Sequence, residues 1–595
     1  MIRFVETAES FSDIFEAKDA VLRFAESASK ENRKSAHLIL DPREYRLERP
    51  LVFDAQEAPS LKNIDLFMTC ENGTATFTSN RILSRSKIEK EGDVYVYRFE
   101  KDENGEYPRF YDVYEDGYRM ELCTSPHFTH AFAFSGENGR ENDENLEGIY
   151  VPEEMAALVP DGDLFPLELM LYVEWEFFVL HVLSVDRSRK KIDENGNTHV
   201  LLKIVPEELY QYVMGMNMSL QPKDREIFFL NHPAFLKENT WCYDHTTGVL
   251  RFSPKFRLRE KIHVPTMTQL LVFKGMDGVS LSGLTFTGIT DKFLMDNGFH
   301  SHQAIVEKKL KEKVPDAAIL TRDVRRFTVK HCEFRELGTN GILMLGRSVM
   351  VDIRDNYFHG ISMSAVSIGD PVKARFAPQN CSFDVHIDHN VVSRVAYEFP
   401  AAPALQVFRV DGLSICHNTI EKCAYSGISA GWEWNPQPYA LGEMVNIRDA
   451  EIAYNHITDH MQLLRDGGAI YVVGPNSIRS YARRFNSIHH NFTCNDRILK
   501  KVRGYYLDGS SSGWDVYQNV TSKMHYPIYI QYNVGDQFTW HNRIDDTYST
   551  EPILPNNHHP ERDTLVGATH IAPTLEALFE AFPEARAIME ESGAK

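Results

Sequence analysis

An asparagine that recurs in one apolar setting constrains the fold of this chain more than any other feature. In six segments an alternating apolar run leads to Asn and then to further apolar residues. The segments are VDIRDNYFHG (351–360), VHIDHNVVSR (385–394), LSICHNTIEK (413–422), AEIAYNHITD (450–459), NSIHHNFTCN (486–495) and WDVYQNVTSK (514–523). From Asn356 to the degenerate Asn542, successive asparagines lie 34, 28, 37, 36, 28 and 23 residues apart. A period of this size predicts stacked structural repeats.

A second short apolar strand follows each asparagine, as in GAIYVVG (468–474) and GYYLDG (504–509). Short strands, variable loops and one Asn per turn are typical of a parallel β-helix, whose coils lie about 4.8 Å apart. A buried Asn is costly unless its amide bonds the coils on either side, which a stack of identical residues permits. We therefore predict an all-β chain built on a right-handed parallel β-helix. His389, His417 and His490 are expected beside this ladder and not on a metal.

Outside the asparagine repeat, the sequence pattern predicts two capping helices and an inserted domain. We expect residues 1–82 to hold a cap helix (10–30) and a first coil (37–53), and residues 83–262 to form an inserted β-rich, sandwich-like domain. Residues 263–550 are expected to form the β-helix with the active-site face, its coils running through 267–545. Residues 551–595 are expected to form a tail with an amphipathic helix (572–591) that caps or braces the C-terminal side.

Charge and composition exclude several classes of partner. The chain of 595 residues has 64 Lys and Arg against 84 Asp and Glu, a formal net charge of −20. Nucleic acids and anionic membranes require a basic surface, so neither is expected as a partner. The apolar stretch 164–183 contains Pro166 and three glutamates, which makes a membrane helix a poor interpretation.

The cysteines and the first residues give further expectations. None of the eight cysteines forms a CxxC pair, so neither a zinc site nor a disulfide framework is predicted. No cofactor is expected. The first ten residues lack the apolar core of a signal peptide, and a cytoplasmic location is therefore expected. The sequence leaves the oligomeric state open.

Several motifs together resemble the β-helix glycoside hydrolases. They are WCYDHTTGVLRFSP (241–254), VPTMTQLLVFKGMDGVSLSGLTFTG (264–288), NHITD (455–459), DGGAIYVVG (466–474) and GYYLDGSS (504–511). The chain looks most like glycoside hydrolase family 141, which contains α-L-fucosidases and xylanases. The xylosidases of family 120 and the lacto-N-biosidases of family 136 share the architecture. The resemblance implies hydrolysis of a neutral oligosaccharide of the fucoside or xyloside type by two carboxylates on the outer face of the coil.

Four acids are candidates for that pair. The resemblance points to Asp466 and Asp508, on neighbouring coils. Asp459 with Asp466 is a competing pair whose seven-residue spacing resembles that of the lacto-N-biosidases. Glu433 lies between two tryptophans, and apolar rings raise the pKa of a carboxyl towards that of a general acid. Asp before glycine is also a common turn residue, so a purely structural role remains open for Asp466.

The expected substrate groove lies on one file of outward residues. Alternation places Ser367, Gln406, Ser429, Tyr471 and Tyr506 on this file, and Trp432 and Trp434 are expected to wall the groove. The predicted substrate-binding residues are Trp432, Trp434, Tyr471, Tyr506, Asp370 and Gln406.

One geometric difficulty concerns the acids. Asp466 precedes its strand whereas Asp508 follows its own, so straight strands would separate the two carboxyls. We expect Gly467 and Gly468 to curl Asp466 back over the sheet through their permissive φ. His460 is expected in a surface loop.

Two other functions fit parts of the sequence. A polysaccharide lyase that acts on a uronate needs a cationic base, for which Lys373, Arg375, Lys500, Lys501 and Arg503 are available. A non-catalytic β-helix could bind glycan through its tyrosine file. An aryl-glycoside panel beside an unsaturated-uronate absorbance assay separates the three.

Overall fold

The computed structural model describes most of the chain. It leaves out residues 129–147, 160–163, 165–166, 210–226, 256–257, 292–298, 304, 309–310, 371–380, 433, 435–445, 476–485, 500, 532–538, 540 and 554–563, and it describes the backbone alone at 299–300, 302, 305–308 and 311–313. The described chain divides into two compact units. The coil unit contains residues 1–79, 267–289 and 316–595, and the inserted unit contains residues 80–266 and 290–315.

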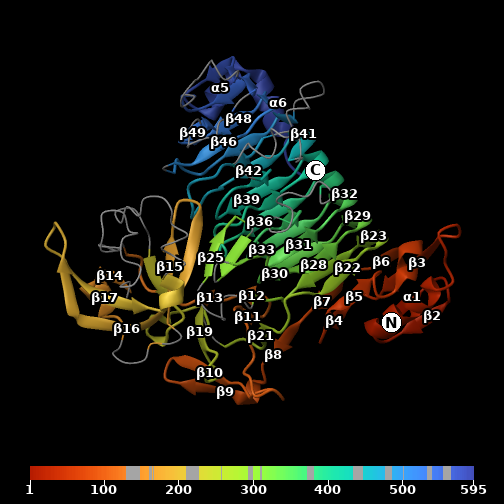
Figure 1. The fold of residues 1–595 in the computed structure, drawn as a ribbon, viewed down its shortest axis with the longest axis horizontal. Coiled ribbons are helices and arrows are strands. Elements are labelled where there is room, and N and C mark those ends of the chain that lie inside the picture. Colours follow the sequence, from red (N-terminus) through yellow and green to blue (C-terminus); the bar gives the residue numbers. More distant parts are fainter. Residues whose placement is uncertain are drawn as a thin grey trace. The chain divides into compact units, whose positions relative to one another are not determined.

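The coil unit is a parallel β-helix with three long sheets (Figure 1). A 14-stranded sheet runs from β2 (Glu9–Phe11) to β52 (Leu565–Val566), and a 12-stranded sheet runs from β4 (Glu44–Arg46) to β53 (Thr569–Ile571). A 10-stranded sheet forms the third side. The chain visits the three sheets in turn, so strands that are neighbours in a sheet come from successive coils. The all-β, β-helix prediction is confirmed.

The 10-stranded sheet carries the strands that the sequence analysis linked to function. Its strands are β5 (Leu51–Asp54), β22 (Leu271–Lys274), β28 (Ala317–Arg322), β31 (Asn340–Leu345), β34 (Val366–Ile368), β37 (Leu405–Val407), β40 (Ile428–Ala430), β43 (Ile470–Val472), β46 (Arg503–Leu507) and β49 (Tyr526–Ile530). Neighbouring strands pair in parallel, as β43 does with β46.

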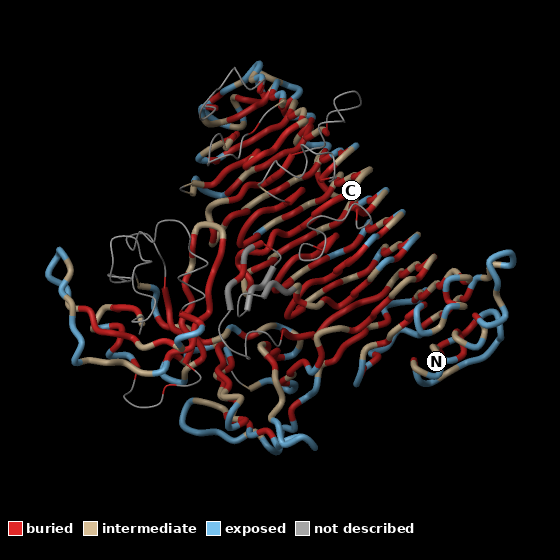
Figure 2. Tube along the Cα trace, viewed as in Figure 1, coloured by how far each residue is buried: buried red, intermediate tan, exposed pale blue. Residues whose placement is uncertain are grey.

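The apolar core fills the coil from end to end, and Figure 2 shows buried strands throughout the stack. Along β43 and β46 the core takes Ile470, Val472, Tyr505 and Leu507. Because side chains alternate along a strand, Tyr471 and Tyr506 must face outward, and they belong to a separate small cluster.

The ladder asparagines lie inside this stack and are fully buried from Asn390 to Asn519. Asn455 is a typical member. Its Nδ2 donates to Ile415 O at 2.8 Å and to Asn491 Oδ1 at 2.9 Å, while its Oδ1 accepts from Asn418 N and Asn418 Nδ2, both at 3.0 Å. Each amide therefore bonds both neighbouring coils, as the sequence analysis predicts.

The residue before each ladder asparagine has a left-handed backbone. At Asp355, His389, His417, Tyr454 and His490, φ lies between 53° and 58°. This conformation is uncommon for residues other than glycine, and its repetition turns the chain between the 14- and 12-stranded sheets at the same place in each coil.

Helices cover parts of both ends of the coil unit. Helix α1 (Ile14–Ala25) packs Ile14, Ala17 and Val21 against the coil core. Near the other end, Pro583 divides the expected single helix into α5 (Leu575–Ala581) and α6 (Pro583–Glu591). These two helices pack through Leu578, Phe579 and Ile588 against residues of the 12-stranded sheet, including Val520 and Tyr548.

The inserted unit is β-rich, with apolar clusters of its own. Its short helix α2 spans Glu153–Ala156, and its long strand β16 spans Glu176–Ile192. The expected run of coils through 267–545 is wrong at 290–315. Strands β25 (Phe299–His302), β26 (Ile305–Lys308) and β27 (Lys311–Lys313) continue the sheet of β16, because β25 pairs with it antiparallel. Both segments of the inserted unit, 80–266 and 290–315, begin after a strand of the 12-stranded sheet and end before a strand of the 10-stranded sheet.

Replacing one ladder asparagine should destabilise the coil. In Asn455→Ala four hydrogen bonds are lost and buried backbone groups of two coils are left unpaired, so we expect a loss of about 3 kcal/mol. Urea denaturation followed by circular dichroism measures it. Asn195→Ala, at an exposed turn, serves as the control. Equal midpoints for the two variants would contradict the structural role of the ladder.

Candidate active site

One file of side chains crosses the outer face of the 10-stranded sheet. Strand register aligns Ser367, Gln406, Ser429, Tyr471 and Tyr506 on successive coils. This is the file expected from the sequence. All five side chains are buried, so the file is covered and does not form the open groove that the sequence analysis expected.

Asp508 follows β46 directly and is surrounded by aromatic donors. Tyr471 OH donates to its Oδ2 at 2.5 Å and Trp434 Nε1 donates to the same oxygen at 3.1 Å. Tyr506 OH donates to Oδ1 at 3.0 Å. The carboxylate thus holds three hydrogen bonds from uncharged groups, and the two phenols fix its position over the file.

Asp466 precedes β43 and carries a charged partner. Arg503 Nη1 lies 2.9 Å from Asp466 Oδ1 and 2.8 Å from Arg465 O. The guanidinium also stacks on two rings of the outer face, 4.6 Å from the centroid of Tyr506 and 4.2 Å from that of Tyr529. Burial acts to lower the pKa of Arg503, but Asp466 and the two phenols outweigh it and raise that pKa. The sequence offers Arg503 only as a base for a lyase, and no motif predicts its pairing with Asp466.

The negative charges of Asp466 and Asp508 both affect the pKa of the same two tyrosines, Tyr471 and Tyr506. Burial is the largest cause that raises the pKa of Tyr471 and of Tyr506 well above the ordinary value. Asp466 and Asp508 each add to the rise at both tyrosines. The two acids therefore lie within electrostatic reach of one pair of rings, although one precedes its strand and the other follows it.

The two glycines after Asp466 are required because a side chain would not fit there, and not because of their φ angles. Neither Gly467 nor Gly468 has a positive φ, so the expected curl is wrong. A Cβ on Gly467 would lie 2.3 Å from Ser426 Oγ, and one on Gly468 would lie 3.2 Å from Tyr506 Cβ. The chain passes too close to its neighbours for a side chain, and Tyr425 OH fixes this path by donating to Asp466 O.

His460 is fully buried, which corrects its expected place in a surface loop. Its Nε2 donates to Arg503 O at 2.8 Å, and its backbone N donates to Asn495 Oδ1 at 3.1 Å. Burial lowers the pKa of His460 to about 4, against a small opposing effect of the bond to Arg503. A neutral imidazole therefore supports the strand that carries Arg503.

The two tryptophans differ in exposure. Trp432 is buried against Phe408, with ring centroids 5.2 Å apart, whereas Trp434 is half-buried and lies 5.0 Å from Trp432. Ser510 Oγ donates to Trp434 O at 2.6 Å, which ties this segment to the turn after Asp508. Glu433, between the tryptophans, lies outside the described residues.

The other predicted residues lie elsewhere on the coil. Asp459 directly follows β42 (His456–Thr458) of the 12-stranded sheet, and its Oδ1 accepts from Asp496 N of the next coil at 2.8 Å. Asp370 is buried at the turn after β34. Of the cations considered for a lyase, Lys373, Arg375 and Lys500 lie outside the described residues.

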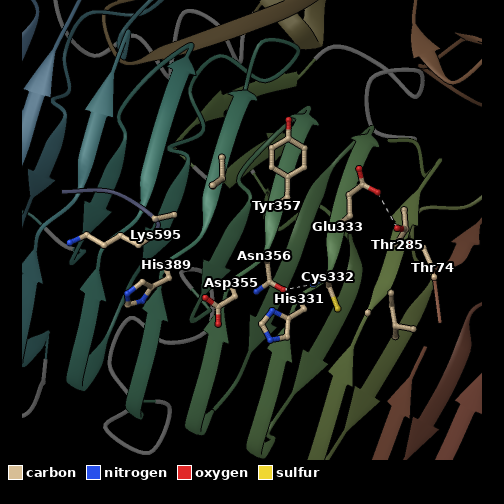
Figure 3. Close-up of a pocket in the computed structure, with 15 residues that line it drawn as sticks. Thr74, Thr285, His331, Cys332, Glu333, Asp355, Asn356, Tyr357, His389 and Lys595 are labelled. Atoms are coloured by element: carbon tan, nitrogen blue, oxygen red, sulfur yellow. Dashed lines mark hydrogen bonds between the residues drawn. The ribbon is translucent and has the colours of Figure 1, made fainter. Parts of the chain in front are cut away.

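A cavity of about 620 Å³ lies at a different corner, between the 14- and 12-stranded sheets (Figure 3). His331, Asp355 and Tyr357 line it, and Lys595 lies at one end. The C-terminal residues reach it along the same corner, where Gly593 N donates to Tyr454 O at 2.8 Å. None of the predicted site residues lines this cavity.

The described residues contain no group of three or more His, Cys, Asp and Glu side chains that could hold a metal ion. None of the helices among them has the length and apolarity needed to cross a membrane.

A solved structure shares this fold. A protein named glycoside hydrolase superposes with a TM-score of 0.71 at 16% identity, covering 97% of this chain and 95% of that one. XylC in complex with xylose matches with a TM-score of 0.35 at 10% identity, over 89% of this chain and 80% of the other. No family model and no curated protein matches the sequence. At 16% identity the likeness to the glycoside hydrolase structure establishes the fold alone.

The burial of neutral His460 should make the protein sensitive to acid. Unfolded histidine binds a proton near pH 6.5, whereas folded His460 does so only near 4, so the unfolded state binds more protons between these values. Stability is complete above pH 6.5 and falls as the pH approaches 4, by about 2 kcal/mol between pH 6.5 and 5.

Melting temperatures measured from pH 7 to 5 check this sensitivity. His460→Gln should show a shallower fall than the wild type, and His386→Gln, an exposed control, should follow the wild type. A slope unchanged in His460→Gln would refute the assignment.

Proposed function

We propose that this chain is a glycoside hydrolase that cleaves a neutral oligosaccharide of the fucoside or xyloside type. The observation that carries the proposal is that Asp466 and Asp508, from adjacent coils, both reach Tyr506: its OH donates to Asp508 at 3.0 Å, and its ring lies 4.6 Å from the guanidinium of Arg503, which pairs with Asp466. Glycoside hydrolysis requires two carboxyl groups at the scissile bond, one ionised and one protonated. The motif resemblance to family 141 supports the choice of sugar, and the shared fold of a solved glycoside hydrolase is consistent with the reaction.

The different partners of the two acids suggest their roles. Two neighbouring carboxylates resist ionising together. Arg503 places a permanent positive charge beside Asp466. Asp508 instead has uncharged donors, and two of them are hydroxyls that can rotate to accept a hydrogen bond from a protonated carboxyl group. We assign the ionised role, as nucleophile or base, to Asp466. Asp508 then protonates the leaving oxygen as an oxocarbenium-like transition state develops.

The rings around the acids suit this chemistry. The exposed part of Trp434 offers an apolar face for a sugar ring, while its Nε1 holds Asp508. Tyr471 and Tyr506 shield part of the half-buried Asp508 carboxylate from water, and partial exclusion of water strengthens charge interactions there.

The lyase alternative has less support. A lyase needs a free cation or base for the uronate carboxylate, but Arg503 is engaged by Asp466 and by two aromatic rings. The lacto-N-biosidase-like pair of Asp459 with Asp466 is also less well supported, because the carboxylate of Asp459 bonds a turn of the 12-stranded sheet.

Substitution of each acid should separate the two roles. Asp466→Asn should lower kcat at least about 10³-fold on every aryl glycoside. Asp508→Asn should lower it to a similar extent on nitrophenyl glycosides but far less on dinitrophenyl glycosides, whose leaving group needs no proton. Steady-state hydrolysis of aryl fucosides and xylosides by each variant measures this.

Asp459→Asn is the matched control, because it removes a carboxylate between the same two sheets without touching the tyrosines. It should keep wild-type kcat with a slightly lower melting temperature. Loss of activity in Asp459→Asn together with full activity in Asp508→Asn would replace the proposed pair by Asp459 and Asp466. Wild-type silence on all aryl glycosides, with absorbance gain on uronates, would favour the lyase.

A further inference from the structure

The cavity at the corner between the 14- and 12-stranded sheets is not used by the proposed reaction (Figure 3). Its volume of about 620 Å³ lies within the range of pockets that hold small molecules. At one end, Gly73 and Gly283 take the left-handed corner position at which later coils carry His331 and Asp355. A Cβ on Gly283 would lie 2.6 Å from Cys70 O. Because a side chain is excluded there, the corner stays open.

One wall of the cavity is a file of outward side chains on the 12-stranded sheet. Register aligns Thr285, Glu333, Tyr357 and Val391 on successive coils, and all four line the cavity. Figure 3 shows Glu333 and Tyr357 next to each other on this file. Glu333 Oε2 accepts from Thr285 Oγ1 at 3.1 Å, which holds the carboxylate beside the tyrosine.

Tyr357 gives this wall an exposed aromatic ring. It is 42% exposed, more than any other Phe, Tyr or Trp in the described part of the coil unit. His359 lies two residues further along the same strand, β33 (Tyr357–Ile361). Its ring plane is within 4° of that of Tyr357, with centroids 6.0 Å apart. A flat ring with a polar hydroxyl suits a ligand that has both apolar and polar faces.

The charges of the cavity select against an anionic ligand. Two carboxylates, Glu333 and Asp355, line it against one amine, that of Lys595. An ionised carboxylate only accepts hydrogen bonds, so it suits the hydroxyl groups of an uncharged polyol. A sugar combines such hydroxyls with an apolar C–H face that can lie on an aromatic ring.

The C-terminal residues show that an extended chain can bind along this corner. Ser592 Oγ donates to His490 O at 3.2 Å, and Ala594 N donates to Thr419 Oγ1 at 3.0 Å. Thr419 pairs with Val391 and is therefore the next member of the file that lines the cavity. The tail follows the corner across successive coils, and beyond Lys595 the cavity continues along the same corner.

We propose that the corner cavity is a second binding site for a neutral glycan, in which a sugar ring lies on Tyr357 and its hydroxyls bond Glu333 and Asp355. The proposal rests on the proposed hydrolase function and adds a place that holds the same class of substrate without cleaving it. The acid pair flanks strands of the 10-stranded sheet, whereas this cavity lies between the other two sheets. A glycan polymer held here would have a raised local concentration at the acid pair.

Calorimetry in the Asp466→Asn background, which prevents cleavage, measures binding to this site. The probes are soluble arabinoxylan and fucosylated xyloglucan. At least one of them should bind, and Tyr357→Ala should weaken its affinity at least about fivefold. Tyr118→Ala is the matched control, because Tyr118 is an exposed tyrosine of the inserted unit, and it should leave the affinity unchanged.

A second variant tests the site even if Tyr357→Ala does not fold. Asp355 has a φ of 55°, which glycine adopts readily, so Asp355→Gly removes a lining carboxylate without straining the backbone. It should weaken binding of the same glycan with little change in melting temperature. Unchanged affinity in both Tyr357→Ala and Asp355→Gly, or no binding of either glycan, would overturn the site.

An oligolysine peptide tests the competing occupant. If it binds more tightly than either glycan, and Asp355→Gly weakens it, the corner is a site for basic polypeptide and the glycan proposal is wrong. Hydrolysis of aryl glycosides tests the proposed reaction separately, and Tyr357→Ala should keep wild-type kcat on them. A protein inactive on every aryl glycoside could still bind glycan at the corner, so the two proposals can fail independently.

Discussion

Backbone pairing between successive coils is the constraint on which the rest of this protein depends. A coil by itself has two unpaired edges, and only the next coil can satisfy its N–H and C=O groups. The asparagine ladder fixes how the coils meet, because each amide bonds the backbone of one coil and the side chain of the next. Left-handed residues before the asparagines turn the chain at the same corner in each coil. Together these features hold three sheets in one register.

That register also builds the candidate site. Tyr471 and Tyr506 meet because Ile470 pairs with Tyr505 and Val472 with Leu507. A shift of one residue in either strand would move a phenol into the core and a core side chain to the surface. The two acids are placed by the chain just outside these strands. The pairing of β43 with β46 therefore stabilises the coil and also positions the candidate site.

Charge on the outer face is distributed unevenly along the coil. Around β43 and β46, Asp466 is balanced by Arg503, and Asp508 is held by neutral donors. Around β37, the buried guanidinium of Arg409 makes no hydrogen bond within the described structure.

The sequence by itself determined the β-helix, the ladder and the tyrosine file, because these follow from periodic patterns in which each repeat confirms the next. Its motifs also pointed to Asp466 and Asp508 as candidate catalytic acids, a prediction that stays to be tested by substitution. It did not reveal the return of 290–315 to the inserted unit, since short strands look alike whichever sheet they join. Nor did it reveal three contacts between residues of different coils. These are the pairing of Arg503 with Asp466, the contact of buried His460 with Arg503, and the tight packing of Gly467 against Ser426.

Only the tertiary structure decided such contacts. Their geometry depends on where variable loops bring the chain back, and no local pattern encodes that distance. The same holds for Arg409: the sequence shows an arginine after a strand, and only the folded coil shows that its side chain is buried.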